Sequence, residues 1–214
     1  MTRRHWGWIV VLALGVAAAV AVWVILREPE TEESLEAWPD DVQFEVRLVH
    51  GDRTYDIELT DFPGVTGWVV YEGPAMVEGE ENWKEPHEYR GVDLRAVVES
   101  VIGMEVVETL TPVALDGWHK TLPAAVLDGD TPCGTVLLAL SVDGEPPQEW
   151  EDAPALVFLP ADERFGNADM LDALGSEYAH YYGQQPSTTG MQVKGVVFLV
   201  VNYDGGALPT LADL

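Results

Sequence analysis

The stretch "EYRGVDLRAVVESVIG", residues 88–103, carries the clearest structural signal in the chain. Asp93 precedes a run of apolar residues as an N-cap, and Gly103 follows the run as a stop. The apolar residues recur at the i, i+3, i+4, i+7 and i+8 positions, which share one face of a helix. The stretch therefore predicts an amphipathic helix packed on a core. Its apolar positions are Leu94, Val97, Val98, Val101 and Ile102.

Strands are predicted on both sides of this helix. "VQFEVRLVH" and "TYDIEL" flank the turn sequence "HGDR", which predicts a strand, turn and strand over residues 42–59. A second helical region is predicted within residues 161–183, where Gly166 and Gly175 interrupt the pattern. Many strands with few, irregularly placed helices indicate an α+β or mainly β domain rather than a doubly wound sheet. Further strands are predicted at residues 65–72, 106–115, 135–142, 155–160 and 193–201.

The segment from Trp6 to Leu26 runs 21 residues without a charge. A helix of that length spans about 32 Å, close to the hydrocarbon thickness of a bilayer. Tryptophans near both ends, and two arginines before the segment, favour a single transmembrane helix with residues 1–5 in the cytoplasm. A cleaved signal peptide is the alternative, because Ala19-Val20-Ala21 resembles a cleavage site, but the apolar run continues past it. We therefore expect a single-pass anchor in the cell membrane and an extracytoplasmic domain.

The anchor divides the rest of the chain into three parts. Residues 27–41 hold seven acids and two prolines, which predicts an acidic stalk. Residues 42–203 form the predicted domain, and residues 204–214 a loose tail.

The charge of the chain narrows the range of partners. Its 37 acidic and 11 basic residues give a net charge of -26. Phosphate binding needs clustered lysines and arginines, so nucleic acid is excluded as a partner. The acids are scattered, which is typical of a generally acidic surface or of adaptation to salty solvent. The lysines are Lys84, Lys120 and Lys194.

No short motif in the sequence marks a catalytic or metal centre. The histidines lie at no metal-ligand spacing, and neither a Gly-x-Ser-x-Gly elbow nor a glycine-rich phosphate loop occurs. Cys133, in "TPCGT", has no neighbour that would activate it, so it is predicted to be a small core residue. The segment "SEYAHYYGQQP", residues 176–186, gathers Tyr178, His180, Tyr181 and Tyr182, which either line a pocket or pack half-buried.

Five short segments occur in an order that resembles the molybdopterin-binding domain of sulfite oxidase-like oxidoreductases. The resemblance covers roughly residues 42–202. It implies an α+β, mainly β mixed-sheet domain of the sulfite oxidase molybdopterin-binding type, here preceded by one transmembrane helix, and a pocket for a pterin cofactor. The segments are Tyr89 with Gly91 to Leu94, Asp116 to Trp118, Asp143 to Pro146, Pro154 to Pro160, and Lys194.

The sequence departs from this family at the metal. In catalytic members a cysteine of a "CVEGW"-like stretch binds molybdenum, whereas the similar "VVYEG" here has Val70 at that position. Valine cannot coordinate a metal. Phosphate and oxyanion groups also need converging cations, and the domain has few. The candidates are Arg90, Arg95, Lys120, Arg164 and Lys194, and of these Arg95 is spaced to pair with Glu99 on the helix surface.

Three functions follow from these observations. The first is a binding or interaction module that has lost molybdenum chemistry and serves a membrane or cell-surface protein partner, with no cofactor. The second is an oxidoreductase that holds the molybdenum cofactor, molybdopterin, through other ligands. The third is a domain whose pocket takes a small solute.

A pocket of this fold would have the "DGW" loop at its rim. Asp-Gly pairs favour tight turns and occur four times in the chain, so the pair alone does not mark a site. His119 could titrate near neutral pH and Lys120 could meet an anion, but both could equally point into water beyond a turn. The predicted rim consists of Tyr89, Arg90, Asp116, Trp118, His119 and Lys120.

Overall fold

The first of two five-stranded sheets joins the beginning and the end of the described chain. The computed structural model describes residues 44–59, 70–77 and 83–210. In the first sheet the strand order is β2 (Arg53–Glu58), β1 (Glu45–His50), β12 (Val196–Val201), β5 (Thr109–Ala114) and β6 (Leu122–Pro123). Strands β1 and β12 run parallel, and the other neighbours run antiparallel.

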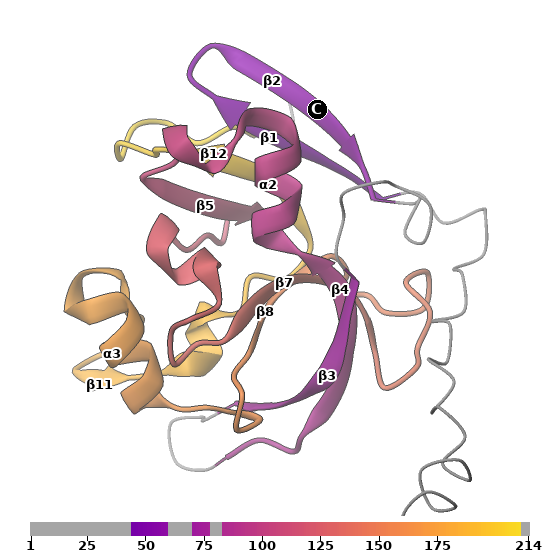
Figure 1. Cartoon of the computed structure of the whole chain (residues 1–214), viewed down its shortest axis with the longest axis vertical. Coiled ribbons are helices and arrows are strands. Elements are labelled where there is room, and N and C mark those ends of the chain that lie inside the picture. The colour runs from indigo at the N-terminus through magenta and orange to yellow at the C-terminus, as the bar shows by residue number, and fades with distance from the viewer. Residues whose placement is uncertain (1–43, 60–69, 78–82, 211–214) are drawn as a thin grey trace, which may run out of the picture. The chain divides into compact units, whose positions relative to one another are not determined.

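The second sheet contains the middle of the chain. Its strand order is β8 (Ala155–Leu159), β7 (Thr135–Val142), β4 (His87–Asp93), β3 (Val70–Val77) and β9 (Arg164–Phe165). Only the β3–β9 pair is parallel among these described strands. Figure 1 shows the two sheets one above the other, with helix α2 beside the place where they meet.

Helix α2 (Leu94–Ile102) forms as its local signals predict. The Asp93 carboxylate accepts a hydrogen bond from the backbone N–H of Arg95 at 2.8 Å, and the backbone N–H of Gly103 bonds the carbonyl of Glu99. Arg95 pairs with Glu99 four residues later and with Asp128. Helix α3 (Asn167–Tyr178) begins after Gly166 and is interrupted at Gly175, which has a φ of 67°.

Short elements complete the described chain. Three 3-10 turns are η1 (Met104–Val106), η2 (Ala124–Asp128) and η3 (Thr188–Met191). After α3, strands β10 (Tyr181–Tyr182) and β11 (Gln185–Pro186) form a small hairpin.

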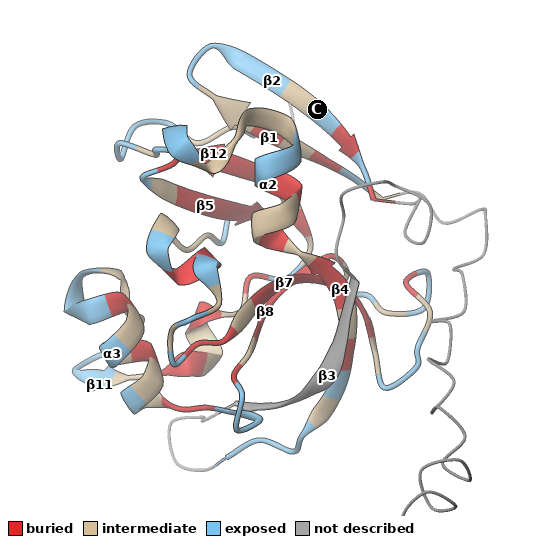
Figure 2. Cartoon of the chain, in the orientation of Figure 1, coloured by how far each residue is buried: buried red, intermediate tan, exposed pale blue. Residues whose placement is uncertain are grey.

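The main core lies between the two sheets and the helices. It takes alternate side chains of the strands, such as Leu138 and Leu140 of β7, together with Val97 and Val98 of α2. All four are at most 1% exposed. Figure 2 shows buried residues over most of β5 and β7 and over part of α2. Each residue of this kind contributes about 1.5–3 kcal/mol when its side chain leaves water.

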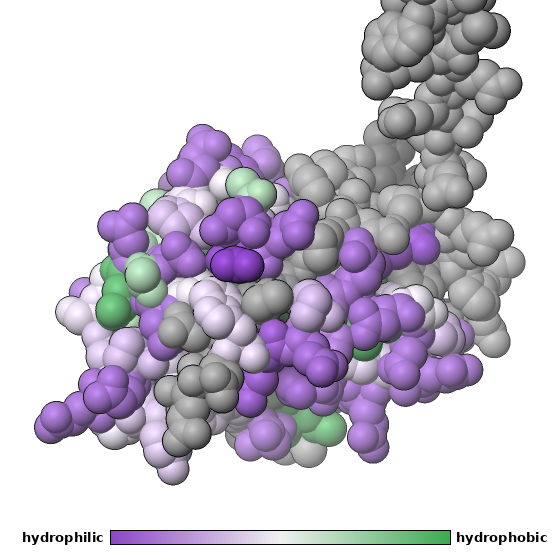
Figure 3. Space-filling model, turned by 90° about the horizontal axis from the view of Figure 1, so that it is seen from below, coloured by the Kyte–Doolittle hydropathy of each residue, from purple (hydrophilic) through white to green (hydrophobic). Residues whose placement is uncertain are grey.

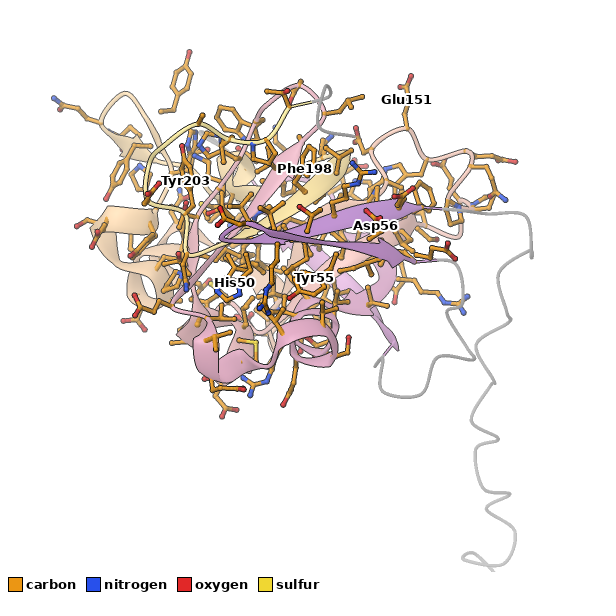
Figure 4. The ribbon with its side chains drawn as sticks, turned by 90° about the horizontal axis from the view of Figure 1, so that it is seen from above. His50, Tyr55, Asp56, Glu151, Phe198 and Tyr203 are labelled. Atoms are coloured by element: carbon orange, nitrogen blue, oxygen red, sulfur yellow. The ribbon has the colours of Figure 1, made fainter. Side chains whose placement is uncertain are left out.

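Each sheet also packs apolar residues on its outer face. On the first sheet Val113, Phe198 and Val200 are covered by Tyr203 and Leu208. Figure 4 shows Phe198 and Tyr203 on one side of the β1–β2 hairpin and Tyr55 on the other. The predicted loose tail, 204–214, is described as far as residue 210, and Leu208 holds that part against the sheet.

The outer face of the second sheet positions the candidate site. A separate apolar cluster lies on this face. It consists of Tyr89 of β4, Leu137 and Ala139 of β7, and Ala155 and Val157 of β8. The chain before β12 crosses the start of β8. The backbone N–H of Leu156 bonds the Val193 carbonyl, and the N–H groups of Gly195 and Val196 bond the carbonyls of Asp152 and Pro154, all at 2.8 Å.

The predicted α+β, mainly β class is confirmed, because most described elements are strands in two mixed sheets. The predicted strands at 135–142 and 155–160 correspond to β7 and β8, and α2 matches its prediction. Strand β4 was not predicted as a strand, although it lies at the centre of the second sheet.

Some predictions concern residues outside the described part. The predicted transmembrane helix, residues 6–26, and the acidic stalk, 27–41, belong to it. Among the described helices, none is long and apolar enough to cross a membrane. Val70 is described as the first residue of β3, where it pairs with Val92.

Candidate functional site

A pocket of about 480 Å³ lies against the outer face of the second sheet. Its floor is built by strands β4, β7 and β8, and its side by the segment between η3 and β12. The volume falls in the range of about 300–1,000 Å³ that is typical of small-molecule sites. The chemically important lining residues are His87, Tyr89, Asp143, Trp150, Asp152 and Lys194.

Three rings form one wall of this pocket. His87 and Tyr89 are two residues apart on β4, so the alternation of the strand points both to the same face. Their ring centroids are 6.1 Å apart with an interplanar angle of 66°. Trp150, from the loop between β7 and β8, lies 6.2 Å from Tyr89 at 49°. The three rings therefore line adjoining parts of the pocket, and a flat molecule can pack against them.

The Tyr89 hydroxyl stays protonated in this setting. Burial raises the pKa of Tyr89 above its usual value, a side-chain hydrogen bond with Gln192 acts in the opposite direction, and the charges of Asp143 and Asp152 raise it further. Tyr89 is 7% exposed. A protonated phenol at the pocket wall can donate a hydrogen bond to a ligand.

One close contact with a carboxylate fixes the His87 ring. The Nδ1 atom of His87 lies 2.6 Å from Oδ2 of Asp143, whose Oδ1 accepts the Glu88 N–H at 2.8 Å. These contacts hold the pKa of Asp143 below its ordinary value, with the His87 hydrogen bond as the largest cause and the Glu88 N–H next. Both partners are substantially exposed, so the pair orients the imidazole and adds little to stability.

An ion pair between Lys194 and Asp152 also lines the pocket. Lys194 Nζ is 2.5 Å from Oδ2 of Asp152. The hydrogen bond from Gly195 N–H to the Asp152 carbonyl holds the two segments together. Two of the three lysines of the chain, Lys84 and Lys194, thus line this pocket.

The residues of the predicted rim do not lie together in the structure. Tyr89 lines the pocket, whereas Arg90, the next residue of β4, is half-buried and does not line it. Residues 116–120 do not line it either. The predicted rim did not include four residues that line the pocket, namely His87, Asp143, Trp150 and Asp152. Two lining residues outside the predicted rim, Asp143 and Lys194, lie in segments of the family resemblance.

The "DGW" turn builds a second cluster with residues after α3. Asp116 Oδ1 accepts the Trp118 N–H at 2.8 Å and so closes the turn. The Trp118 ring meets the His180 ring edge-on at 5.6 Å. Lys120 Nζ lies 2.9 Å from His180 Nδ1 and 4.7 Å from the centroid of the Trp118 ring. The structure thus brings Trp118 and Lys120 together with His180.

His119 turns away from this second cluster. Its Nδ1 atom lies 3.0 Å from the Gly117 carbonyl oxygen, and its ring meets Tyr203 edge-on at 6.0 Å. It therefore packs near the outer face of the first sheet.

The pocket residues do not fit the phosphate of a molybdopterin cofactor. Asp152 already neutralises Lys194, and carboxylates outnumber lysines in the lining. The described residues include no group of three or more His, Cys, Asp or Glu side chains placed to hold a metal ion.

Cys133 is a core residue, as predicted, and its thiol is expected to be inert. It is 0% exposed, and burial raises its pKa to about 12, with the Asp169 charge adding to the effect. At pH 8, iodoacetamide should leave the native protein unlabelled and should alkylate Cys133 fully in denaturant, because only the thiolate reacts. Intact-protein mass spectrometry measures both. Rapid labelling of the native protein would contradict the burial of this thiol.

The surface around these sites is largely polar. Figure 3 shows the face seen from below as mostly hydrophilic, with only small separate hydrophobic areas among the described residues. Comparison with known proteins adds no relative: no protein-family model matches the chain, and no curated protein matches it.

Proposed function

We propose that this protein is a membrane-anchored, extracytoplasmic binding module whose pocket takes a small, flat organic ligand. The fold is that of the sulfite oxidase molybdopterin-binding type, without molybdenum chemistry. The aromatic wall of His87, Tyr89 and Trp150 carries the proposal, because three rings around one pocket favour stacking on a planar molecule.

The family resemblance supports the fold part of the proposal. Four of its five segments contribute lining residues to the one pocket, although they are far apart in the sequence. These residues are Tyr89, Asp143, Ala155 to Val157, and Lys194. The segment from Asp116 to Trp118 is the exception.

The charges of the lining select the kind of ligand. Two lysines and four carboxylates line the pocket, so its formal charge is −2 when His87 is neutral. A multiply charged anion such as a phosphate or sulfite would meet net repulsion there. The ligand is therefore a neutral or cationic planar heterocycle that accepts a hydrogen bond from Tyr89. The acidic residues are Glu85, Asp143, Glu145 and Asp152.

The proposal is tested by ligand-induced stabilisation of the full-length protein. A panel of neutral and cationic planar heterocycles, including a pterin without phosphate, is screened for compounds that raise Tm. For a compound that binds, Trp150→Ala should weaken Kd by about tenfold or more, because it removes a wall of the site. Trp118→Ala is the matched control, since Trp118 does not line the pocket, and it should leave Kd unchanged.

Three results would overturn the proposal. The first is that no heterocycle in the panel raises Tm. The second is that Trp150→Ala and Trp118→Ala weaken binding equally. The third is that protein from its native host contains stoichiometric molybdenum and releases a fluorescent pterin on oxidation, which would identify an oxidoreductase.

A further inference from the structure

Lys120 has different neighbours from the described cations that form ion pairs. Arg47, Arg95 and Lys194 each have a carboxylate oxygen within 4.0 Å. For Lys120 the structure shows no such carboxylate among the described residues. Its Nζ atom contacts a neutral acceptor, His180 Nδ1, at 2.9 Å and the face of the Trp118 ring at 4.7 Å.

The His180 ring is fixed in the position that this contact requires. A Cβ atom added at Gly190 would lie only 1.8 Å from His180 Cδ2, so the imidazole packs directly on the η3 backbone. The His180 carbonyl accepts the Ser187 N–H at 3.0 Å, and the edge of Trp118 closes another side. The imidazole therefore has little freedom to turn its Nδ1 atom away from Lys120.

The surroundings of Lys120 favour the free amine over the ammonium ion, relative to a lysine in water. Lys120 is half-buried, and burial lowers its pKa. The pKa of His180 is also lowered, first by burial and then by the charge of Lys120, which favours the neutral imidazole whose Nδ1 faces the Lys120 amine. The Trp118 ring favours the ammonium, but it is 43% exposed and its effect is correspondingly weak.

We propose that Lys120 is a nucleophilic amine that forms an imine with a small carbonyl compound, an aldehyde or ketone, at a second site distinct from the pocket. In this step His180 Nδ1 removes a proton from the Lys120 ammonium, and the freed amine attacks the carbonyl carbon. The nitrogen passes a second proton to the carbonyl oxygen, and His180 returns the first proton to the same oxygen. Water then leaves, and a protonated C=N bond replaces the C=O bond. No oxidant or reductant is needed.

Exposed aromatic side chains provide a place for the carbon skeleton of this compound. Trp118 is 43% exposed, and Tyr181 and Tyr182, which follow His180 directly, are 37% and 66% exposed. An aldehyde with an aromatic or other apolar body can lie on the exposed Trp118 ring while its carbonyl group meets Lys120, whose Nζ atom is 4.7 Å from the centroid of that ring. The site is thus suited to an uncharged carbonyl compound in a strongly acidic protein.

The experiment traps the imine on the full-length protein. Benzaldehyde and sodium cyanoborohydride are added at pH 7, and peptide mass spectrometry follows benzylation of each lysine. The chain has only three lysines, so Lys84 and Lys194 are internal references. Lys120 should react at least about threefold faster than either, because a lysine with a lowered pKa holds more free amine at pH 7. Equal or slower reaction at Lys120 overturns the proposal.

Two variants test the part played by His180. His180→Asn retains a hydrogen-bond acceptor but cannot take up a proton, and His180→Ala removes both properties. Both should slow benzylation of Lys120 by at least about threefold and leave Lys84 and Lys194 unchanged. An unchanged Lys120 rate in His180→Asn would exclude His180 as the base. The two reference lysines lie at the pocket, so a variant that unfolds is recognised by a change in their benzylation rates. In that case the comparison of the three lysines in the wild-type protein still decides the proposal.

Discussion

Replacing Gly91 by alanine is expected to destabilise the domain by roughly 3 kcal/mol. An added Cβ would lie 2.4 Å from the Leu138 carbonyl oxygen and 2.5 Å from Ala139 Cα. Both atoms belong to the backbone of β7, the hydrogen-bonded neighbour of β4. Neither can move without breaking the pairing of the two central strands, so a side-chain rotation cannot relieve the clash.

Urea unfolding of the full-length variant measures this loss as a lower midpoint at an unchanged slope. The matched control is Gly144→Ala in the turn after β7, where an added Cβ meets no atom within 4 Å at a φ of +77°. That control should cost about 1–2 kcal/mol from its backbone conformation alone. If Gly91→Ala costs no more than the control, the close approach of β4 to β7 is wrong.

The same substitution should also affect the pocket. The pairing of β4 with β7 shifts register between Arg90 and Gly91, and Tyr89 precedes this irregularity. Bulges of this kind re-aim neighbouring side chains. Pushing the two strands apart at Gly91 would therefore displace Tyr89 from the aromatic wall.

The sequence predictions are most accurate where the whole signal for an element lies within a short stretch of the chain. Helix α2 has its cap, its apolar face and its stop within a dozen residues, so its sequence contains the whole signal. Strands β7 and β8 are continuous apolar runs because both their faces are covered. Strand β4, "HEYRGVD", has no such run. It is a strand because β3 and β7 pair with it on both sides, and that pairing depends on residues distant in the sequence.

Missing β4 also limited the prediction of the pocket. Tyr89 was named from the family resemblance, but the alternation that places His87 beside it becomes visible only in a strand. The His87–Asp143 pair joins residues 56 apart, and the Lys194–Asp152 pair joins residues 42 apart. Such pairs are set by strand order and by the crossing before β12, neither of which has a local signal.

The "DGW" turn shows a different limit. Its turn chemistry is local, and Asp116 closes it as an Asp-Gly pair should. The order of segments along the chain does not determine which neighbour such a turn faces. In the structure that neighbour is His180, from the segment whose aromatic residues the sequence left open between a pocket and simple packing. The cluster around Lys120 thus joins two loops that are 60 residues apart in the sequence.

Gly134→Ala is expected to have the largest effect on stability, a loss of roughly 3–5 kcal/mol. Gly134 has a φ of +65°, which costs other residues about 1–2 kcal/mol. An added Cβ would also lie 1.9 Å from the Leu159 carbonyl oxygen and 2.5 Å from Pro160 Cα, both backbone atoms at the end of β8. The variant must therefore separate the start of β7 from the end of β8, next to the buried Cys133.

The control for this substitution is Gly129→Ala. Gly129 has a similar φ of +77°, but the nearest atom to its added Cβ is Thr135 Oγ1 at 3.9 Å. It should lose only the conformational cost of about 1–2 kcal/mol. The difference between the two midpoints in urea then measures the steric part, and opening of the β7–β8 edge should make Cys133 reactive toward iodoacetamide in the Gly134 variant alone. Equal midpoints, with Cys133 protected in both variants, would mean that the chain before β7 yields without disturbing β8.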